Sequence, residues 1–577
     1  MAFQISPGVN VSEVDLTTVV PSVLTTAGAF AGTFPWGPAN QPVTTDSEIN
    51  LVRNFAPAGP DSDSAISFFT AANFLSYGNN LKIVRAVGAN ANNSTSSTGN
   101  VQILNASSFE VSLLNQNNGN AYGPFIARYP GTLGNNIKVE VFDSSNTTLY
   151  NAWTYKNYFQ SAPSTSSYAS QQNGSNDEIH IVVIDSTGKF TGVANTVLET
   201  FGFVSKAYDA TLNGSTNYYK QVIFDQSRYV YATDPVDYSN TSNSWGQTAS
   251  GRTFVRINTT DYPNGNYSTP LTKGSDVLPT VGNLQTAYDQ FKNKDSIDVS
   301  LVLTGDASST LQNYVISTIA NPDTLTDARR DCVVFVSPPS SAVVNKSGQE
   351  TTLITAWSSS LTQSSYVFAD SGWKYQYDKY NNVYRWIPLN GDIAGLCVST
   401  DTARDPWYSP AGFNRGAIKN AIKLAWNPSK SDRDTIYSAG VNPVVSFPGQ
   451  GIVLYGDKTL QNKPSAFDRI NVRRLFITLE RSISTAAKYS LFELNDEFTR
   501  AQFVSLVTPF LRDVQGRRGI TDFKVVCDST NNTPQVIDGN RFVGDIYIKP
   551  ARSINYIQLN FVAVATGVDF TTIVGSA

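Results

Sequence analysis

Apolar residues occupy every second position in the last strand-like stretch of the chain. Ile557, Leu559, Phe561 and Ala563 point one way and the residues between them point the other, which is the period of a paired β-strand. Residues 542–549 have the pattern of a second strand just before it. The sequence shows no later strand to cover the edge of the last one, and an open edge invites pairing with another chain.

Helical and strand-like patterns alternate between residues 272 and 455, and one similar strand-like run stands earlier in the chain. The apolar, β-branched runs are 81–87, 297–306, 332–339 and 365–372, and the helical runs are 284–293 and 311–320. This alternation is typical of βαβ units on a mostly parallel sheet. Because residues 81–87 have the same character as the later runs, the sheet is predicted to begin before residue 90 and to resume after residue 272.

The residues in between are dense in Asn, Ser, Thr, Gly and Tyr and poor in charge, with alternating runs at 136–142 and 179–185. This composition predicts a β-rich domain inserted into an α/β domain. The fold class that we expect is therefore multidomain, α/β and α+β. Its parts are an N-terminal arm (1–20), a discontinuous middle α/β domain (21–90 and 272–455), the β-rich insertion (91–271) and an α+β C-terminal domain (456–577) with its own arm from about 552.

Two amphipathic helices are predicted in the C-terminal domain. The first carries Arg473, Arg474 and Arg481 off its apolar face, and that face consists of Val472, Leu475, Phe476, Leu479 and Ile483. The second is predicted to begin at an N-cap near Asn495 and to end at Gly516, with Pro509 marking a kink or a first-turn boundary. Its apolar face consists of Phe503, Leu506, Val507, Phe510 and Leu511.

Positive charge concentrates in the same region. Between Arg469 and Arg552 there are 13 Lys and Arg residues against 9 Asp and Glu, a net charge of +4. The rest of the chain has 29 against 37, a net charge of −8. The C-terminal domain is therefore predicted to be the cationic part of the protein.

The overall composition narrows the class of protein. With 577 residues the chain exceeds what one hydrophobic core usually supports, so we expect three or four domains. A net charge of −4 gives no general attraction to nucleic acid or to anionic membranes, so we expect no direct nucleic-acid binding. We also expect no secretion signal and no membrane insertion, because no basic n-region precedes an apolar segment and no run near 18 apolar residues occurs.

A search for catalytic or metal chemistry finds no complete motif. His180 stands alone in an alternating run and is predicted to be an ordinary strand residue. Residues 451–459 resemble a phosphate loop, but Asp457 stands where that motif requires Lys. Asp61 and Asp63 have the spacing of a calcium loop without its Gly and Glu. We expect no catalytic residue, cofactor site or metal site, and no enzyme.

The three cysteines, Cys332, Cys397 and Cys527, lie far apart in apolar, strand-like contexts. Their spacing fits no zinc pattern, so they are predicted to be small core residues in a reducing compartment.

An aromatic stretch at 372–388 leaves one alternative function open. It is predicted to form a β-hairpin that turns at Asn381 and Asn382, because cross-strand aromatic pairs stabilise hairpins. The same aromatic residues could stack on sugars, so a carbohydrate-binding surface adhesin is the alternative function. A hydrolase that uses two carboxylates is a third class, for which the sequence gives no particular pair.

Several longer motifs resemble one protein family. "NFLSYGNNLKIVRAV" (73–87), "FDRINVRRLF" (467–476), "VVCDSTNNTPQVID" (525–538) and "IKPARSINYIQLNFVAVATG" (548–567) are the longest, together with the shorter "SPGV" (6–9), "AGTFPWGPA" (31–39) and "GIVLYGDKT" (451–459). In this order they closely resemble the tail sheath proteins of T-even-type contractile-tailed bacteriophages. The resemblance covers the first 90 and roughly the last 120 residues, is weaker through the middle, and does not extend to the insertion at 91–271.

The resemblance implies a structural protein of the virion, assembled in the cytoplasm of a host bacterium. Such subunits form a helical homopolymer of six-fold rings around a tail tube, and this jacket contracts to drive the tube through the host envelope. Implied partners are other copies of the chain, the tail tube protein, the baseplate and the tail terminator. The insertion would be an outer domain and the cationic C-terminal domain an inner one, with Arg512, Arg517 and Arg518 as candidates for contact with the tube.

The resemblance also implies that the terminal segments are arms that complete β-sheets in neighbouring subunits. The strand residues assigned to these exchanged arms are Val9, Val11, Val14, Ile557, Leu559, Phe561 and Ala563. Addition of a strand from another chain would provide the partner that the last strand of the sequence lacks.

Overall fold

The computed structural model describes Val20, Gln558 and residues 25–114, 121–236, 244–258, 260–320 and 329–555. The chain divides into two compact units. Of the described residues, the larger unit, here called the main unit, contains those between 25 and 406 and Pro410–Thr485. The smaller, here called the C-terminal unit, contains Val20, Trp407–Ser409, residues 486–555 and Gln558. This division falls later in the chain than the predicted boundary at 456, which stays a prediction.

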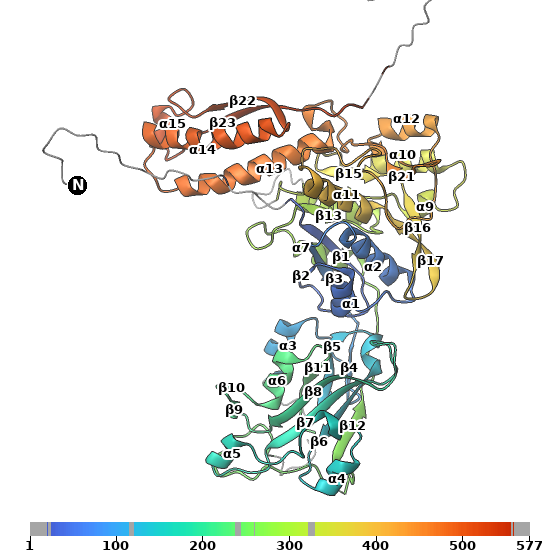
Figure 1. Cartoon of the computed structure of the whole chain (residues 1–577), viewed down its shortest axis with the longest axis vertical. Helices are drawn as coiled ribbons and strands as arrows, with labels where there is room; N and C mark the ends of the chain where they lie inside the picture. Colours follow the sequence, from blue (N-terminus) through green and yellow to red (C-terminus); the bar gives the residue numbers. More distant parts are fainter. Residues whose placement is uncertain are drawn as a thin grey trace, which may run out of the picture. The chain divides into compact units, whose positions relative to one another are not determined.

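A seven-stranded sheet forms the centre of the main unit (Figure 1). In spatial order its strands are β19 (Val441–Asn442), β15 (Val367–Asp370), β14 (Val333–Val336), β13 (Leu301–Leu303), β1 (Gly28–Gly32), β3 (Leu81–Arg85) and β2 (Val43–Thr45). Every neighbouring pair is parallel except β2 with β3, which are antiparallel. The sequence prediction of a mostly parallel sheet that begins before residue 90 and resumes after residue 272 is confirmed.

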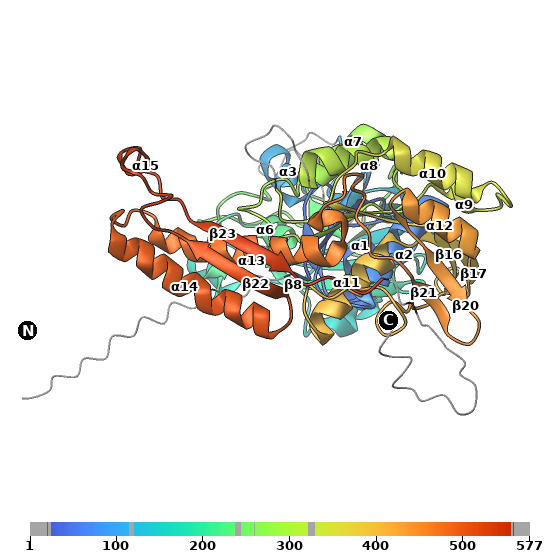
Figure 2. The same cartoon turned by 90° about the horizontal axis from the view of Figure 1, so that it is seen from above.

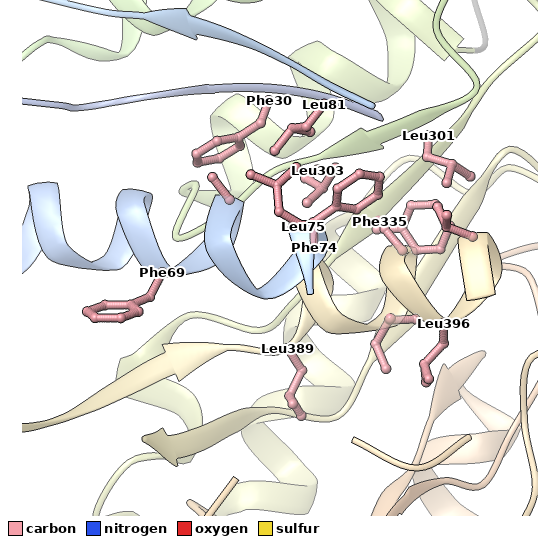
Figure 3. Close-up of a cluster of buried hydrophobic side chains, with 14 of the residues drawn as sticks. Phe30, Phe69, Phe74, Leu75, Leu81, Leu301, Leu303, Phe335, Leu389 and Leu396 are labelled. Carbon is pink, nitrogen blue, oxygen red and sulfur yellow. The ribbon is translucent and has the colours of Figure 1, made fainter. Parts of the chain in front are cut away.

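Helices pack against both faces of this sheet. They are α1 (Glu48–Phe55), α2 (Ser62–Leu75), α7 (Val281–Asp289), α8 (Ser309–Val315), α9 (Ser340–Val343), α10 (Glu350–Ser360), α11 (Asn390–Ala403) and α12 (Lys430–Ser438). Because side chains alternate across a strand, Phe30, Leu303 and Phe335 pack in one core with α2 and α11 (Figure 3). Ala29 and Val302 belong to a second core with α7, α8 and α10 on the opposite face.

The first part of helix α13 (Ile470–Ala487) also belongs to the main unit. Ile470 and Ile477 pack in the core that contains α2 and α11, which explains why the main unit extends past residue 456. Cys397 lies within α11, so its predicted strand-like context is wrong, whereas Cys332 directly precedes β14. A short apolar run does not by itself distinguish a buried helix from a buried strand.

The inserted residues form sheets of their own (Figure 1). One sheet has the order β12 (Asn266–Pro270), β6 (Ile137–Phe142), β7 (Glu178–Asp185), β8 (Thr196–Ser205), and a second has β11 (Val230–Ala232), β5 (Phe125–Pro130), β4 (Asn93–Thr95). The short strands β9 (Thr211–Leu212) and β10 (Ser215–Thr216) pair with each other. The helices of this segment are α3 (Ala106–Ser112), α4 (Thr147–Ala152), α5 (Ser167–Gln171) and α6 (Tyr219–Gln226).

Side chains from the middle domain reach into the inserted sheets. Trp36 is 3% exposed, and its ring centroid lies 5.2 Å from that of Tyr129 and 5.2 Å from that of Phe190. Arg85 at the end of β3 donates hydrogen bonds to the backbone oxygens of Phe34, Pro35 and Gly37 and, at 2.7 Å, to that of Pro130. The insertion is therefore held by a packed and hydrogen-bonded joint as well as by its two chain crossings.

Candidate assembly interface

The C-terminal unit is built from one long helix and one hairpin (Figure 2). Helix α14 (Glu497–Gly516) begins at the N-cap Asp496, whose side chain accepts a hydrogen bond of 2.8 Å from the backbone N–H of Thr499. The predicted cap, Asn495, is one residue too early. Pro509 lies inside the helix, and Gly516 is its last residue.

Hydrophobic burial holds the hairpin of this unit to the helix. Phe503, Val507, Leu511 and Val514 are the buried residues of α14, which lies against β22 (Ile520–Val526). Strand β22 pairs antiparallel with β23 (Asp545–Pro550), with Phe523 opposite Ile548 and Val525 opposite Ile546. The connection between the two strands contains α15 (Pro534–Asp538).

The hairpin is an incomplete sheet within the part of the chain that the structure describes. There, β22 and β23 pair only with each other, so the outer edge of each strand has no partner strand. On the face away from the helix, Tyr547 is 60% exposed and Lys524 opposite it is exposed as well. An isolated two-stranded hairpin is marginally stable, and open edges are templates for strands of another chain. The hairpin can therefore accept a strand on either side.

The arm strands that the sequence predicts for this role cannot be placed. Val9, Val11, Val14, Ile557, Leu559, Phe561 and Ala563 all lie outside the described residues. The described chain after β23 reaches Asn555, with Ile554 82% exposed. The arms stay a prediction.

The three tube-facing candidates lie on the surface toward the end of α14. Arg512 is exposed on the helix, and Arg517 is its C-cap residue. The guanidinium of Arg517 lies 5.2 Å from the ring centroid of Trp407, whose indole N–H donates to the Arg517 carbonyl. Arg518 has a φ of +64°, in the left-handed region. The structure thus brings the three arginines to one end of the helix.

Several of the basic residues that give the predicted C-terminal domain its positive charge belong to the main unit and not to the C-terminal unit. Arg474 of α13 donates to Asp401 at 2.8 Å, Arg481 pairs with Asp298, and Arg473 donates to Ser365 at 2.6 Å, all inside the main unit. Residues 486–552 keep 9 Lys and Arg against 8 Asp and Glu, a net charge of +1. Any electrostatic attraction at the C-terminal unit must come from local clusters, since its net charge is nearly zero.

The residues that were discounted as chemical sites have structural roles. His180 is fully buried on β7, where its Nε2 lies 2.8 Å from the Ser161 carbonyl and burial lowers its pKa. Asp457 forms an ion pair with Arg469 at 3.2 Å, and Asp61 caps α2 through the backbone N–H of Ser64. The prediction that His180 is an ordinary strand residue is confirmed.

At the carboxyl ends of β14 and β15 the chain's own side chains occupy the sheet edge where α/β proteins usually bind ligands. Ser337 after β14 donates a hydrogen bond of 2.7 Å to Asp370 at the end of β15. Asn390 of α11 donates to Ser337 and to the backbone oxygen of Gly305. Burial raises the pKa of Asp370 to about 8. The polar groups at this edge bind one another.

The helices of the described residues are each too short or too polar to cross a bilayer.

Comparison with protein families gives two adjacent matches. Residues 296–460 match the model of the phage tail sheath protein central domain, and residues 462–563 match the model of the phage tail sheath C-terminal domain. The chain is 34% identical to the tail sheath protein of Vibrio phage KVP40, with 99% of this chain and 100% of that protein aligned. It is 33% identical to the tail sheath protein of Enterobacteria phage T4, with 99% of each aligned.

Comparison with solved structures shows that the fold is similar to those of sheath proteins. A sheath tail protein from Listeria innocua superposes with a TM-score of 0.53 at 11% identity, covering 93% of this chain and 94% of that one. The helical sheath of the anti-feeding prophage in its contracted state superposes with a TM-score of 0.50 at 12% identity, covering 97% and 99%. At this identity the likeness concerns the mixed α/β fold alone.

Proposed function

The chain belongs to the phage tail sheath protein family, and from that membership we propose that it polymerises as a helical jacket around a tail tube. Contraction of this jacket drives the tube through the envelope of a host cell. The chain is a structural subunit of a contractile sheath and a component of the virion. The observation that carries the proposal is the alignment of 99% of the chain with the tail sheath proteins of two phages.

Neighbouring subunits are linked by exchanged arms. The N-terminal arm (1–20) and the C-terminal arm from about 552 add strands to the β22–β23 hairpin of neighbouring copies. Among the described residues neither outer edge of that hairpin has a partner strand, which supports this step, because each edge has a row of backbone donors and acceptors that a strand can pair with. A ladder of backbone hydrogen bonds on a long arm keeps subunits tethered while they rotate during contraction.

The C-terminal unit faces the tube. Arg512, Arg517 and Arg518 supply a local positive cluster there, although residues 486–552 have a net charge of only +1. The inserted segment, which is poor in charge, faces outward. The remaining partners are the baseplate and the tail terminator at the two ends of the polymer, and assembly takes place in the cytoplasm of the host bacterium.

Negative-stain electron microscopy of the purified full-length chain tests this function. A sheath subunit forms tubes with regular helical striation, in six-fold rings, without any other protein. Separate globular particles at every protein concentration and ionic strength tried would contradict self-assembly.

A further inference from the structure

The segment that joins α13 to α14, together with the first turn of α14, exposes an unusual number of large apolar side chains. Their exposed fractions are 74% for Tyr489, 63% for Leu491, 105% for Phe492, 77% for Leu494 and 70% for Phe498. No other ten-residue stretch of the described chain exposes as many. We call residues 489–498 the apolar knob. A contiguous exposed apolar patch of this kind marks a surface that binds a partner.

Side-chain hydrogen bonds hold the knob in place. Asn495 donates a hydrogen bond of 2.9 Å to the Arg541 carbonyl and accepts one of 3.0 Å from Arg500, and Asp496 caps α14. Phe492 has a φ of +71°, which is strained for a bulky residue. Strained backbone that presents a fully exposed aromatic ring is costly to a subunit in water, and a contact that buries the ring offsets this cost.

The main unit has a groove with an apolar lining that could receive the apolar side chains of the knob. It lies between α2, strand β16 (Trp373–Asp378) of the aromatic hairpin and residues 418–422, and its volume is about 710 Å³. Phe69, Ala72 and Leu75 of α2, Tyr377 of β16, Ile418 and Ile422 contribute its apolar lining. Ile422 is 57% exposed and Tyr377 is 45% exposed. We call this surface the α2 groove.

The two surfaces have opposite charges. The knob contains Glu493, Asp496 and Glu497 and no basic residue. Lys379, which lines the groove, pairs with Glu48 at 3.0 Å. Exposed Lys419 and Lys423 flank the lining residues 420–422 and leave the groove positive. Opposite charges around apolar centres favour the correct partner and its orientation.

We propose that the apolar knob of one subunit inserts into the α2 groove of a second copy of this chain. A heterologous contact of this kind joins two different patches of one chain and generates a helical polymer. Apolar surfaces with opposite charges on two parts of one chain are what such a contact requires. The inference rests on the proposed self-assembly, and it adds a second kind of contact that does not use the arms.

Cysteine cross-linking between two differently marked copies tests the contact. Full-length chains carrying Phe492→Cys are mixed with full-length chains carrying Ile422→Cys, assembled and oxidised. The native Cys332, Cys397 and Cys527 are buried. A covalent dimer is expected only in the assembled mixture. The matched control replaces Ile422→Cys by Val193→Cys on the inserted segment, where Val193 is 65% exposed, and no dimer is expected.

Charge reversal gives an independent readout. Glu493→Lys with Glu497→Lys, or Lys419→Glu with Lys423→Glu, should each raise the protein concentration needed for polymerisation by about tenfold. All four changes together should restore it to within about threefold of the wild type. Asp496 is left unchanged because it caps α14.

The outcomes of these experiments distinguish failure of the knob contact from failure of self-assembly. Polymers that form normally without the 492–422 dimer would overturn the knob contact and leave self-assembly intact. A wild-type chain that never polymerises would overturn both.

Discussion

Asp370 shows how one buried carboxyl group couples the stability of the main unit to pH. It is 1% exposed at the end of β15, where it accepts hydrogen bonds from Ser337 and from the backbone N–H of Gly372. Burial raises its pKa to about 8, whereas a carboxyl group in an unfolded chain has a pKa of about 3.9. Because the folded state binds this proton more tightly, the contribution of Asp370 to stability is complete below the unfolded pKa and is lost as pH rises through about 8.

The variant Asp370→Asn should therefore flatten the pH dependence of unfolding. Between pH 5 and pH 8 the wild type should lose up to about 1 kcal/mol per pH unit relative to the variant, as measured by denaturant unfolding. Asp295→Asn, at an exposed aspartate, serves as the control and should keep the wild-type slope. Parallel pH profiles for the wild type and Asp370→Asn would contradict this role of the buried proton.

Arg85 is the residue that joins the middle domain to the insertion. Replacing it by Met should destabilise the main unit by about 2–5 kcal/mol, because four carbonyl oxygens lose their donor. Lys should not restore the wild-type stability, since an ammonium group lacks the fork of donors of a guanidinium. Urea unfolding measures both variants, with exposed Arg228→Met as the control. Full stability of Arg85→Lys would show that the fork geometry is unimportant.

At the scale of elements, the periodic patterns predicted helices and strands well. The stripe on α13 is buried except for Phe476, which is half-buried, and the strand runs of the parallel sheet are buried as expected, since burial of one face is what creates such patterns. The partners of Arg473, Arg474 and Arg481 could not be predicted, because they come from residues 298, 365 and 401, far away in the sequence. The sequence also could not predict that β22 and β23 lack outer partners among the described residues, because an alternating pattern describes one strand and not its neighbours.

The arginines at the end of α14 are predicted to contact the tail tube. Changing Arg512, Arg517 and Arg518 to Glu should weaken assembly on isolated tubes by about tenfold or more, and added salt should weaken the wild type in the same direction. Co-sedimentation with tubes measures both effects. Changing the solvent-exposed Arg228 of the insertion to Glu is the control. Assembly that is insensitive to both the substitutions and the salt would remove these arginines from the interface.

For the whole molecule, the insertion can be tested as a separate part. Replacement of residues 91–271 by a short Gly/Ser linker should leave a folded chain that still polymerises, because a surface insertion contributes little to the parent core. Trp36 packs in the core of the insertion, so the linker variant should also carry Trp36→Ser to avoid a newly exposed indole. Circular dichroism and light scattering report the outcome. Loss of soluble folded protein both with and without Trp36→Ser would contradict the predicted boundary.

The arms decide whether the chain is a subunit that links to its neighbours by strand exchange. A chain without residues 1–15, or one that ends at Ala551, should keep the circular dichroism of the full chain, because the strands of the seven-stranded sheet lie between residues 28 and 442. Net hydrogen bonds of roughly 0.5–1.5 kcal/mol each add up along an exchanged strand and are lost together in the truncated chains.

The most direct measurement is the size of the assemblies that the full chain and these two truncated chains form, followed by light scattering at equal protein concentration. We expect long polymers from the full chain and only folded monomers or short oligomers from either truncated chain. Normal polymerisation of a truncated chain would contradict strand exchange at that terminus. Global unfolding of a truncated chain would also contradict it, because the missing strand would then belong to its own subunit's core.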